Sequence, residues 1–164
     1  MPIRIQVSDL LSTPGKARAE SVSAPLHIHL PGATVDSDAV VELALRSLSD
    51  GIVVRGVATV TAELTCDLCL TEWSQEMSVP LEQIYRLQPD DEDDELPLDE
   101  HAWVDIEPVV HDEVSLGLPR SPRCRSECRG LCPTCGSDLN VDPCGGHGED
   151  VASPFAALRD LLES

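Results

Sequence analysis

The chain has 164 residues, of which 30 are Asp or Glu and 11 are Lys or Arg, giving a formal net charge of −19. This length fits one domain, or one domain with a small appendage, and the excess of acid excludes a protein that coats nucleic acid by charge alone. No apolar run approaches the roughly 18 residues of a membrane helix, and the N-terminus lacks a basic segment followed by an apolar one, so we expect a cytoplasmic protein with no membrane partner.

The N-terminal part predicts two strands. Apolar and polar residues alternate over 3–7, which indicates a short strand. Residues 12–25 are rich in Ser, Pro, Gly and Ala and predict a flexible connection. A second strand follows over 26–30, and we expect His27 and His29 on its exposed face. Two histidines at this spacing can chelate a metal, but nothing nearby in the sequence completes a site.

The clearest local signal is a β-hairpin. Apolar residues alternate over 41–46, a Ser-Asp-Gly turn follows at 49–51, and a β-branched run covers 52–64. Asp-Gly between two such runs is a strong hairpin signal. We expect Gly56 to form a bulge or bend, and a further strand over 77–87.

Residues 88–101 predict a solvated acidic loop. From Asp90 to Glu113 there are 12 acidic residues and no Lys or Arg, so the segment repels itself. A solvated loop is the simpler interpretation. The alternative is an imitation of RNA that attracts a basic partner.

A helix is predicted after this loop. Glu107-Pro108 places proline at the first helical position, and Val110, Val114 and Leu118 then share one buried face. Gly117 and Pro119 end the helix. A second short helix is predicted from Ser153, its cap, to Leu162.

Seven cysteines, an odd number in a chain expected in the cytoplasm, favour metal ligands over disulfides. Five of them follow the spacing C-x3-C-x3-C-x2-C-x8-C. Its Cys-Pro-Thr-Cys-Gly core is typical of a zinc knuckle, in which two thiolates bind one metal about 2.3 Å away and glycine allows the tight turn. This pattern predicts a closed, structural Zn²⁺ site. The five residues are Cys124, Cys128, Cys132, Cys135 and Cys144.

The spacing leaves the ligand set open. Cys132 and Cys135 are the safest pair, and either Cys124 with Cys128 or Cys128 with Cys144 could complete the site.

A third combination takes its other two ligands from the early Cys66-x-x-Cys69 pair. His147, three residues beyond the cluster, is a further candidate. The alternatives for Cys66 and Cys69 are two small buried residues at the end of a strand, or a redox pair, for which a βαβ context is missing.

No enzyme is expected. An open catalytic zinc site would need a water position and a general base, whereas this ligand supply is almost entirely cysteine. The sequence also lacks a Ser-His-Asp pattern, a phosphate-binding loop and a dinucleotide fingerprint, so no small-molecule substrate is expected.

Four of the eleven basic residues fall within ten positions on the approach to the knuckle, and only Glu127 opposes them. Arginine binds phosphate through its planar fork. We therefore predict that this patch meets RNA or a ribosomal surface. The alternative is that it pairs with the acidic stretch 90–113 within the molecule. The residues are Arg120, Arg123, Arg125 and Arg129.

Together these patterns predict an α+β protein: an antiparallel β-sheet, a helix, a cysteine-rich zinc-knuckle segment and a short C-terminal helix. The expected division is 1–118, a mainly β domain with its acidic loop at 88–101, and 119–164, the zinc-binding segment with the terminal helix.

The chain resembles the YceD family, named for large ribosomal RNA subunit accumulation. The resemblance rests on the run 124–140 (CRSECRGLCPTCGSDLN), on Leu-Gly-Leu-Pro at 116–119, and on Cys-Asp-Leu-Cys-Leu at 66–70. With the terminal Ser-Pro-Phe helix it covers roughly residues 40–164. Family members usually have Arg where Leu68 stands and a terminal Cys-x-Cys where this chain has Cys144-Gly-Gly-His147, which leaves His147 as a substitute ligand.

The resemblance implies a bacterial, cytoplasmic, non-enzymatic ribosome-biogenesis factor that supports 23S rRNA accumulation or processing. Its partner would be rRNA or the pre-ribosomal large subunit. The alternative is an acidic adaptor or chaperone that holds a basic ribosomal protein without touching RNA.

Overall fold

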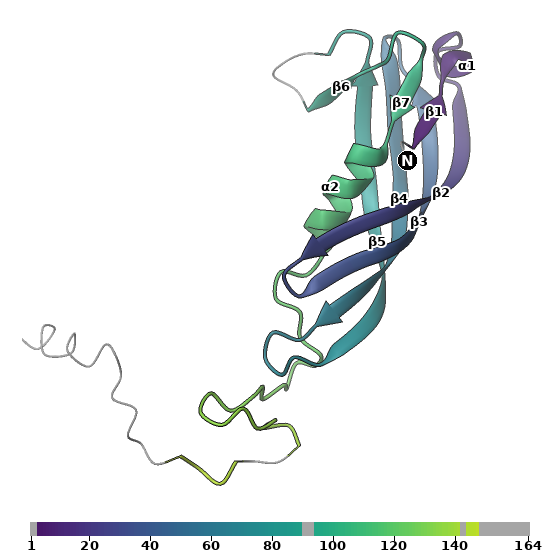
Figure 1. Ribbon diagram of the computed structural model, residues 1–164. Helices are drawn as coiled ribbons and strands as arrows, with labels where there is room; N and C mark the ends of the chain where they lie inside the picture. Colours follow the sequence, from purple (N-terminus) through teal and green to yellow (C-terminus); the bar gives the residue numbers. More distant parts are fainter. Residues whose placement is uncertain (1–2, 90–93, 142–143, 148–164) are drawn as a thin grey trace, which may run out of the picture.

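The computed structural model describes residues 3–89, 94–141 and 144–147. Long strands occupy most of the described chain, with two helices beside them (Figure 1). This architecture confirms the α+β class. In chain order the elements are β1 (Arg4–Gln6), α1 (Ser8–Leu11), β2 (Ala17–Leu30), β3 (Ala33–Ser47), β4 (Gly51–Thr65), β5 (Glu72–Arg86), β6 (Glu95–Pro97), β7 (Trp103–Asp105) and α2 (Glu107–Gly117).

The main sheet has the strand order β2-β3-β4-β5-β6, and β1 pairs with β7 in a small second sheet. Neighbouring strands of the main sheet run antiparallel, except β6, which runs parallel to β5. The predicted hairpin is confirmed as β3 and β4. On β3, Val41, Leu43 and Leu45 are buried and the residues between them are exposed, as a period of two requires.

The flexible connection predicted over 12–25 is wrong for most of its length, because β2 begins at Ala17. From there to Leu30 the strand pairs with β3 without a break. Small and polar residues can occupy this strand because it lies at the edge of the sheet, where Pro25 is also tolerated. Backbone pairing along β3 therefore overrides the loop-like composition.

Of the bulge or bend predicted at Gly56, the bulge is wrong. Gly56 lies in continuous register opposite Leu43 on β3 and Leu81 on β5, and the irregularity lies instead between Thr34 and Val40. A Cβ at Gly56 would collide with the carbonyl oxygen of Glu42. Glycine is needed here for close backbone approach and not for a change of register.

The acidic stretch is only partly a loop. Residues 90–93 lie outside the described part, but β6 pairs with β5, and Leu98 is buried after it. Arg86 anchors the segment, with its Nε 2.8 Å from Glu95 Oε1. Strand pairing with β5 and the burial of Leu98 thus order the C-terminal half of residues 88–101, a segment predicted from its charge to be a solvated loop.

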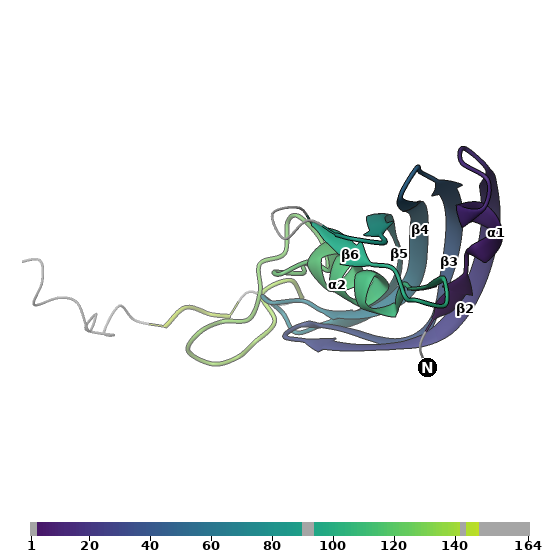
Figure 2. The same ribbon diagram turned by 90° about the horizontal axis from the view of Figure 1, so that it is seen from above.

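The helix predicted after Glu107-Pro108 is confirmed as α2, and it lies inside the curve of the main sheet (Figure 2). Val110 and Val114 are fully buried, and Leu118 follows them into the core. At Gly117 a Cβ would lie 2.9 Å from Val79 Cγ2 on β5, so glycine permits the helix to approach the sheet closely.

No helix among the described residues is long and apolar enough to span a membrane. The helix predicted from Ser153 lies outside the described residues, and the division at residue 118 stays a prediction.

Candidate metal centres

The first two cysteines occupy the tight loop that joins β4 to β5. Cys66 N–H donates to the carbonyl of Thr71 (2.9 Å), and Leu70 N–H donates to the carbonyl of Cys66 (2.9 Å). Leu70 takes a positive φ of 60° to close this turn. Cys66 and Cys69 are both buried. The loop therefore holds two thiols, fixed in position, at one end of the sheet.

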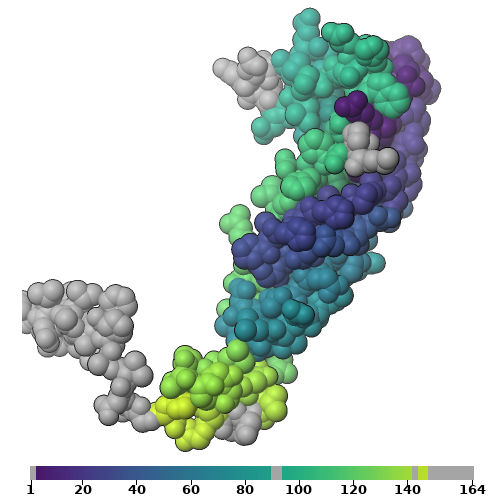
Figure 3. All heavy atoms as spheres, in the orientation of Figure 1, coloured from purple at the N-terminus to yellow at the C-terminus, as the bar shows by residue number. Residues whose placement is uncertain are grey.

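The segment after α2 runs back to this loop. Asp67 N–H donates to the carbonyl of Pro122 (2.9 Å), and the Ser121 hydroxyl donates to Asp67 Oδ2 (2.5 Å). These bonds bring Cys124 and Cys128 against the β4–β5 loop. In space-filling view, residues 120–141 lie at one end of an elongated body (Figure 3).

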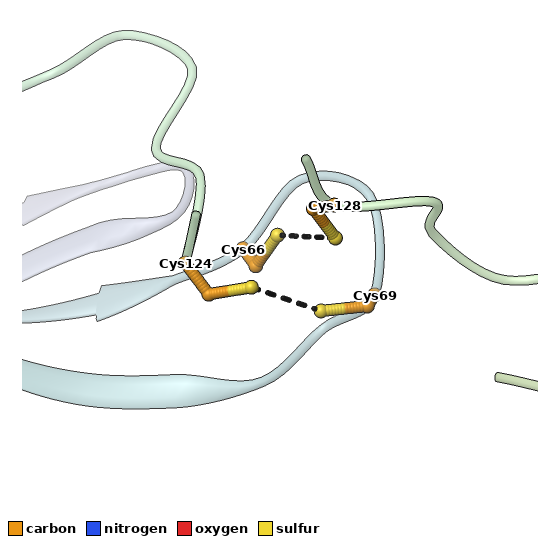
Figure 4. A group of neighbouring side chains, drawn as sticks. All are labelled: Cys66, Cys69, Cys124 and Cys128. Atoms are coloured by element: carbon orange, nitrogen blue, oxygen red, sulfur yellow. Dashed lines mark hydrogen bonds between the residues drawn. The ribbon is translucent and has the colours of Figure 1, made fainter. Parts of the chain in front are cut away.

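Cys66, Cys69, Cys124 and Cys128 form a compact group, which we call the sheet centre (Figure 4). Their sulfur atoms all lie within 4.8 Å of one another. Cys66 Sγ is 3.8 Å from Cys128 Sγ, and Cys69 Sγ is 3.6 Å from Cys124 Sγ. Four sulfurs bound tetrahedrally to zinc at about 2.3 Å are about 3.8 Å apart, whereas a disulfide needs about 2.05 Å. The sheet centre has the dimensions of a tetrahedral thiolate site.

The loop also prepares its thiols to lose protons. A hydrogen bond from the backbone N–H of Cys124 is the main cause that lowers the pKa of Cys66 to about 6. The Thr71 hydroxyl, 3.2 Å from Cys69 Sγ, lowers the pKa of Cys69. Desolvation of its sulfur inside the group raises the pKa of Cys124 to about 12. Metal ligands must be thiolates, so the two loop cysteines are better prepared to bind metal than Cys124.

Cys132, Cys135, Cys144 and His147 form a second group, the knuckle centre, with ligand atoms again within 4.8 Å of one another. Cys132 N–H donates to the carbonyl of Ser137, and Gly136 N–H donates to the carbonyl of Cys132, each at 2.8 Å. These bonds close the tight turn that the sequence predicted.

The turn also changes the proton affinities of its ligands. Backbone N–H groups, first that of Cys135, lower the pKa of Cys132. The Ser137 hydroxyl is the main cause that lowers the pKa of Cys135 to about 6. A hydrogen bond to Cys135 raises the pKa of His147.

The two centres are linked through the backbone and through one side chain. Leu131 N–H donates to the carbonyl of Leu68 in the β4–β5 loop (2.9 Å). Asn140 accepts a hydrogen bond from Arg129 N–H at its Oδ1 (2.8 Å), and its Nδ2 lies 3.6 Å from Cys128 Sγ. Asn140, which lies between Cys135 and Cys144 of the knuckle centre, thus donates to a sulfur of the sheet centre.

The structure divides the sulfur ligands differently from each of the three combinations considered from spacing. Cys132 and Cys135 lie with Cys144 and His147, while Cys66 and Cys69 lie with the two cysteines at 124 and 128. Spacing along the chain could not predict this division, because it depends on where the β4–β5 loop meets the segment after α2. The sequence did carry one signal for two centres: cysteine pairs occur both in the β4–β5 loop and in the segment after α2.

The four arginines of the predicted patch are all exposed. Within the described residues, none of them forms an ion pair with a carboxylate, including those of 94–113. Arg123 and Arg125 flank Cys124, and Arg129 follows Cys128. Their backbone positions are therefore set by the ligands of the sheet centre.

His27 and His29 lie on the exposed face of β2, as predicted, each with 67% of its side chain exposed. The sequence analysis missed their neighbour on β3. Asp36 Oδ1 lies 2.9 Å from His27 Nδ1 and 3.5 Å from His29 Nε2. β3 begins at Ala33, well before the alternation predicted from residue 41, and its pairing with β2 creates this contact.

Comparisons with known proteins find one matching family model and several similar mycobacterial proteins. A family model described as "Large ribosomal RNA subunit accumulation protein YceD" matches residues 54–162. Uncharacterized proteins of Mycobacterium tuberculosis and Mycobacterium bovis are each 31% identical over 98% of this chain and 82% of their own length. One from Mycobacterium leprae is 31% identical over 98% of this chain and 78% of its own. No solved structure matches.

Proposed function

Because the chain belongs to the YceD family, whose name implies a role in large ribosomal RNA subunit accumulation, we propose that it is a non-enzymatic factor supporting 23S rRNA accumulation during large-subunit assembly in the cytoplasm. The family match spans both metal centres and the arginines between them. The proposal makes this end of the molecule the one that meets the pre-ribosomal large subunit.

The observation that carries the proposal is the position of four exposed arginines, the arginine surface, in a chain of net charge −19. Elsewhere the surface is dominated by acid and would be repelled by phosphate. The arginine surface offers guanidinium groups that can bind phosphate in bidentate fashion. It comprises Arg120, Arg123, Arg125 and Arg129.

Zinc in the sheet centre would have a structural role. Bound to four thiolates it leaves no position for water or substrate, and its chemical contribution is to hold two chain segments together. Cys124 and Cys128 would then fix the backbone beside Arg123, Arg125 and Arg129. A fixed backbone lowers the entropy lost when these side chains bind RNA.

Binding of 23S rRNA fragments to the purified, zinc-loaded chain tests the proposal. The double variant Arg123→Glu/Arg125→Glu should weaken binding by about tenfold or more and flatten its dependence on salt, since each lost phosphate contact removes about 0.9 from the salt slope. The matched control compares Arg46→Glu with Arg123→Glu alone, because Arg46 is exposed on β3 and forms no ion pair among the described residues, whereas Arg55 is paired with Glu82. Equal effects of the two variants would contradict specific contact by the arginine surface.

The net charge of −19 favours a second candidate function, that of an acidic adaptor which holds a basic ribosomal protein. This adaptor would bind the protein with strong salt dependence and leave naked 23S fragments unbound. Depletion of the protein in cells tests the large-subunit role that both candidate functions share. A selective fall in the ratio of 23S to 16S rRNA supports this role, and an unchanged ratio argues against it.

A further inference from the structure

We propose that the knuckle centre is a second, independent zinc site, with His147 as its nitrogen ligand, so that the chain holds one zinc ion in each centre. The inference does not depend on the proposed role in rRNA accumulation. It rests on the donor set, on the local construction of the turn and on the fact that the two centres share no ligand.

The donor set fits a tetrahedral ion. Three sulfurs and an imidazole nitrogen lie within 4.8 Å of one another, and Cys144 Sγ is 3.5 Å from Cys132 Sγ. That separation is close to the 3.8 Å edge expected for two sulfurs about 2.3 Å from one zinc ion. It is far longer than a disulfide bond. Three cysteines and one histidine are a common ligand set for structural zinc.

The site is built locally. All four ligands lie between residues 132 and 147, and the turn from Cys132 to Ser137 is closed by its own backbone hydrogen bonds. The Ser137 hydroxyl lies 3.1 Å from Cys135 Sγ, which gives that ligand the outer partner typical of metal sites. No strand or helix contributes a ligand, so this centre can form or be lost without breaking the sheet.

The knuckle centre is also the more accessible of the two. Of its ligands only Cys132 is buried, whereas Cys135 and His147 are exposed. The sheet centre has two buried thiols in the β4–β5 loop. A chelator should therefore remove zinc from the knuckle centre first, and release should occur in two steps.

Zinc content of the full chain, purified under reducing conditions, gives the first test. We expect about two equivalents of zinc for the native chain and about one for Cys132→Ser/Cys135→Ser, with the far-ultraviolet circular dichroism of the sheet retained. One equivalent in the native chain would overturn the proposal. Loss of both ions from the double variant would overturn the independence of the sites.

Cobalt substitution identifies the nitrogen ligand, because the visible spectrum of Co²⁺ distinguishes four sulfurs from three sulfurs and one nitrogen. Replacing both zinc ions should give the sum of these two spectra. His147→Cys should keep two equivalents and convert the spectrum to the four-sulfur type, whereas His147→Ala should remove the nitrogen signature. Unchanged spectra in both variants would exclude His147 as a ligand and overturn the proposed site.

Discussion

Cys66 and Cys128 place their sulfur atoms 3.8 Å apart although 62 residues separate them in the chain. The contact joins the loop between β4 and β5 to the segment that follows α2. A metal ion between them would close a long loop containing β5, β6, β7 and α2. The sheet centre therefore ties the sheet to the segment that carries both the arginine surface and the knuckle.

Loss of this tie should expose the arginine segment to trypsin. Cys128→Ser removes one ligand of the sheet centre and should increase cleavage after Arg123 and Arg125 by about tenfold or more, since a loss of 1.4 kcal/mol of local stability already changes an opening equilibrium tenfold. Cys144→Ser is the control, because it alters only the knuckle centre. Mass spectrometry of early digests measures cleavage after Arg123 and Arg125 in both variants. Equal cleavage in the two would contradict the claim that the sheet centre holds this segment against the sheet.

Short-range patterns predicted those parts of the fold that depend on neighbouring residues. The β3–β4 hairpin follows from alternation around Asp50-Gly51, and α2 follows from Pro108 with Val110 and Val114 on one face. Each signal lies within the element that it predicts. The knuckle turn belongs to the same class, because Cys132 to Gly136 contains its own hydrogen bonds.

What could not be predicted depends on pairing across the fold. The first half of β2 is ordered by β3, and the composition of residues 17–25 carries little sign of it. The division of ligands between two centres depends on the backbone bond from Asp67 to Pro122. Spacing showed which residues were candidates for metal binding, and only the topology separated them into two groups.

Asn140 should strengthen metal binding at the sheet centre without being a ligand. Its Nδ2 lies 3.6 Å from Cys128 Sγ and its Oδ1 accepts from Arg129 N–H. Outer partners of this kind are typically worth ten- to hundredfold in metal affinity. We expect Asn140→Ala to lower the zinc affinity of the sheet centre by that factor, measured by competition with a chromophoric chelator.

The variant Asn140→Asp separates the two roles of this amide, as acceptor from Arg129 N–H and as donor to the Cys128 sulfur. Asn140→Asp keeps an acceptor for Arg129 N–H but loses the donor to sulfur and adds negative charge beside thiolates, so it should be at least as damaging as alanine. Val141→Ala is the neighbouring control, because Val141 is 83% exposed. If Asn140→Asp bound zinc like the native chain, the bond to sulfur would have no energetic role.

The N-terminal turn should contribute to stability in a pH-dependent way. Asp9 lies 2.9 Å from Lys16 Nζ and 2.7 Å from Arg18 Nη1, and the hydrogen bond from Lys16 is the main cause that lowers the pKa of Asp9 below its usual 3.8. A pKa that is lower in the folded state adds stability above the unfolded value, and this stability is lost as pH falls through the folded pKa.

Asp9→Asn should therefore reduce stability at neutral pH, and its difference from the native chain should shrink as pH falls below 3.8 and on through the lower pKa of the folded state. Urea unfolding across this range measures the difference, with Asp112→Asn, at an exposed position of α2, as the control. A constant difference at all pH values would show that the Asp9 charge contributes nothing and that the variant acts by another route.

Alanine substitutions at Gly130 and Gly136 test how the knuckle packs against the β4–β5 loop. Both have positive φ, 71° and 73°, so alanine at either position costs about 1 kcal/mol or more in backbone strain. At Gly130 a Cβ would also lie 2.8 Å from the carbonyl oxygen of Leu68, the acceptor of Leu131 N–H, whereas at Gly136 nothing lies within 4 Å. Gly130→Ala must therefore shift the docked backbone, and Gly136→Ala need not.

Amide hydrogen exchange at Leu131 reports this docking directly. We expect Gly130→Ala to accelerate exchange at Leu131 by about tenfold or more. Loss of the hydrogen bond to Leu68 costs about 1 kcal/mol or more, and this cost is added to that of the backbone strain. Gly136→Ala should loosen the knuckle turn while leaving the protection of Leu131 largely intact. Equal loss of protection in both variants would mean that strain within the turn, rather than contact with Leu68, controls how the knuckle is held against the sheet centre.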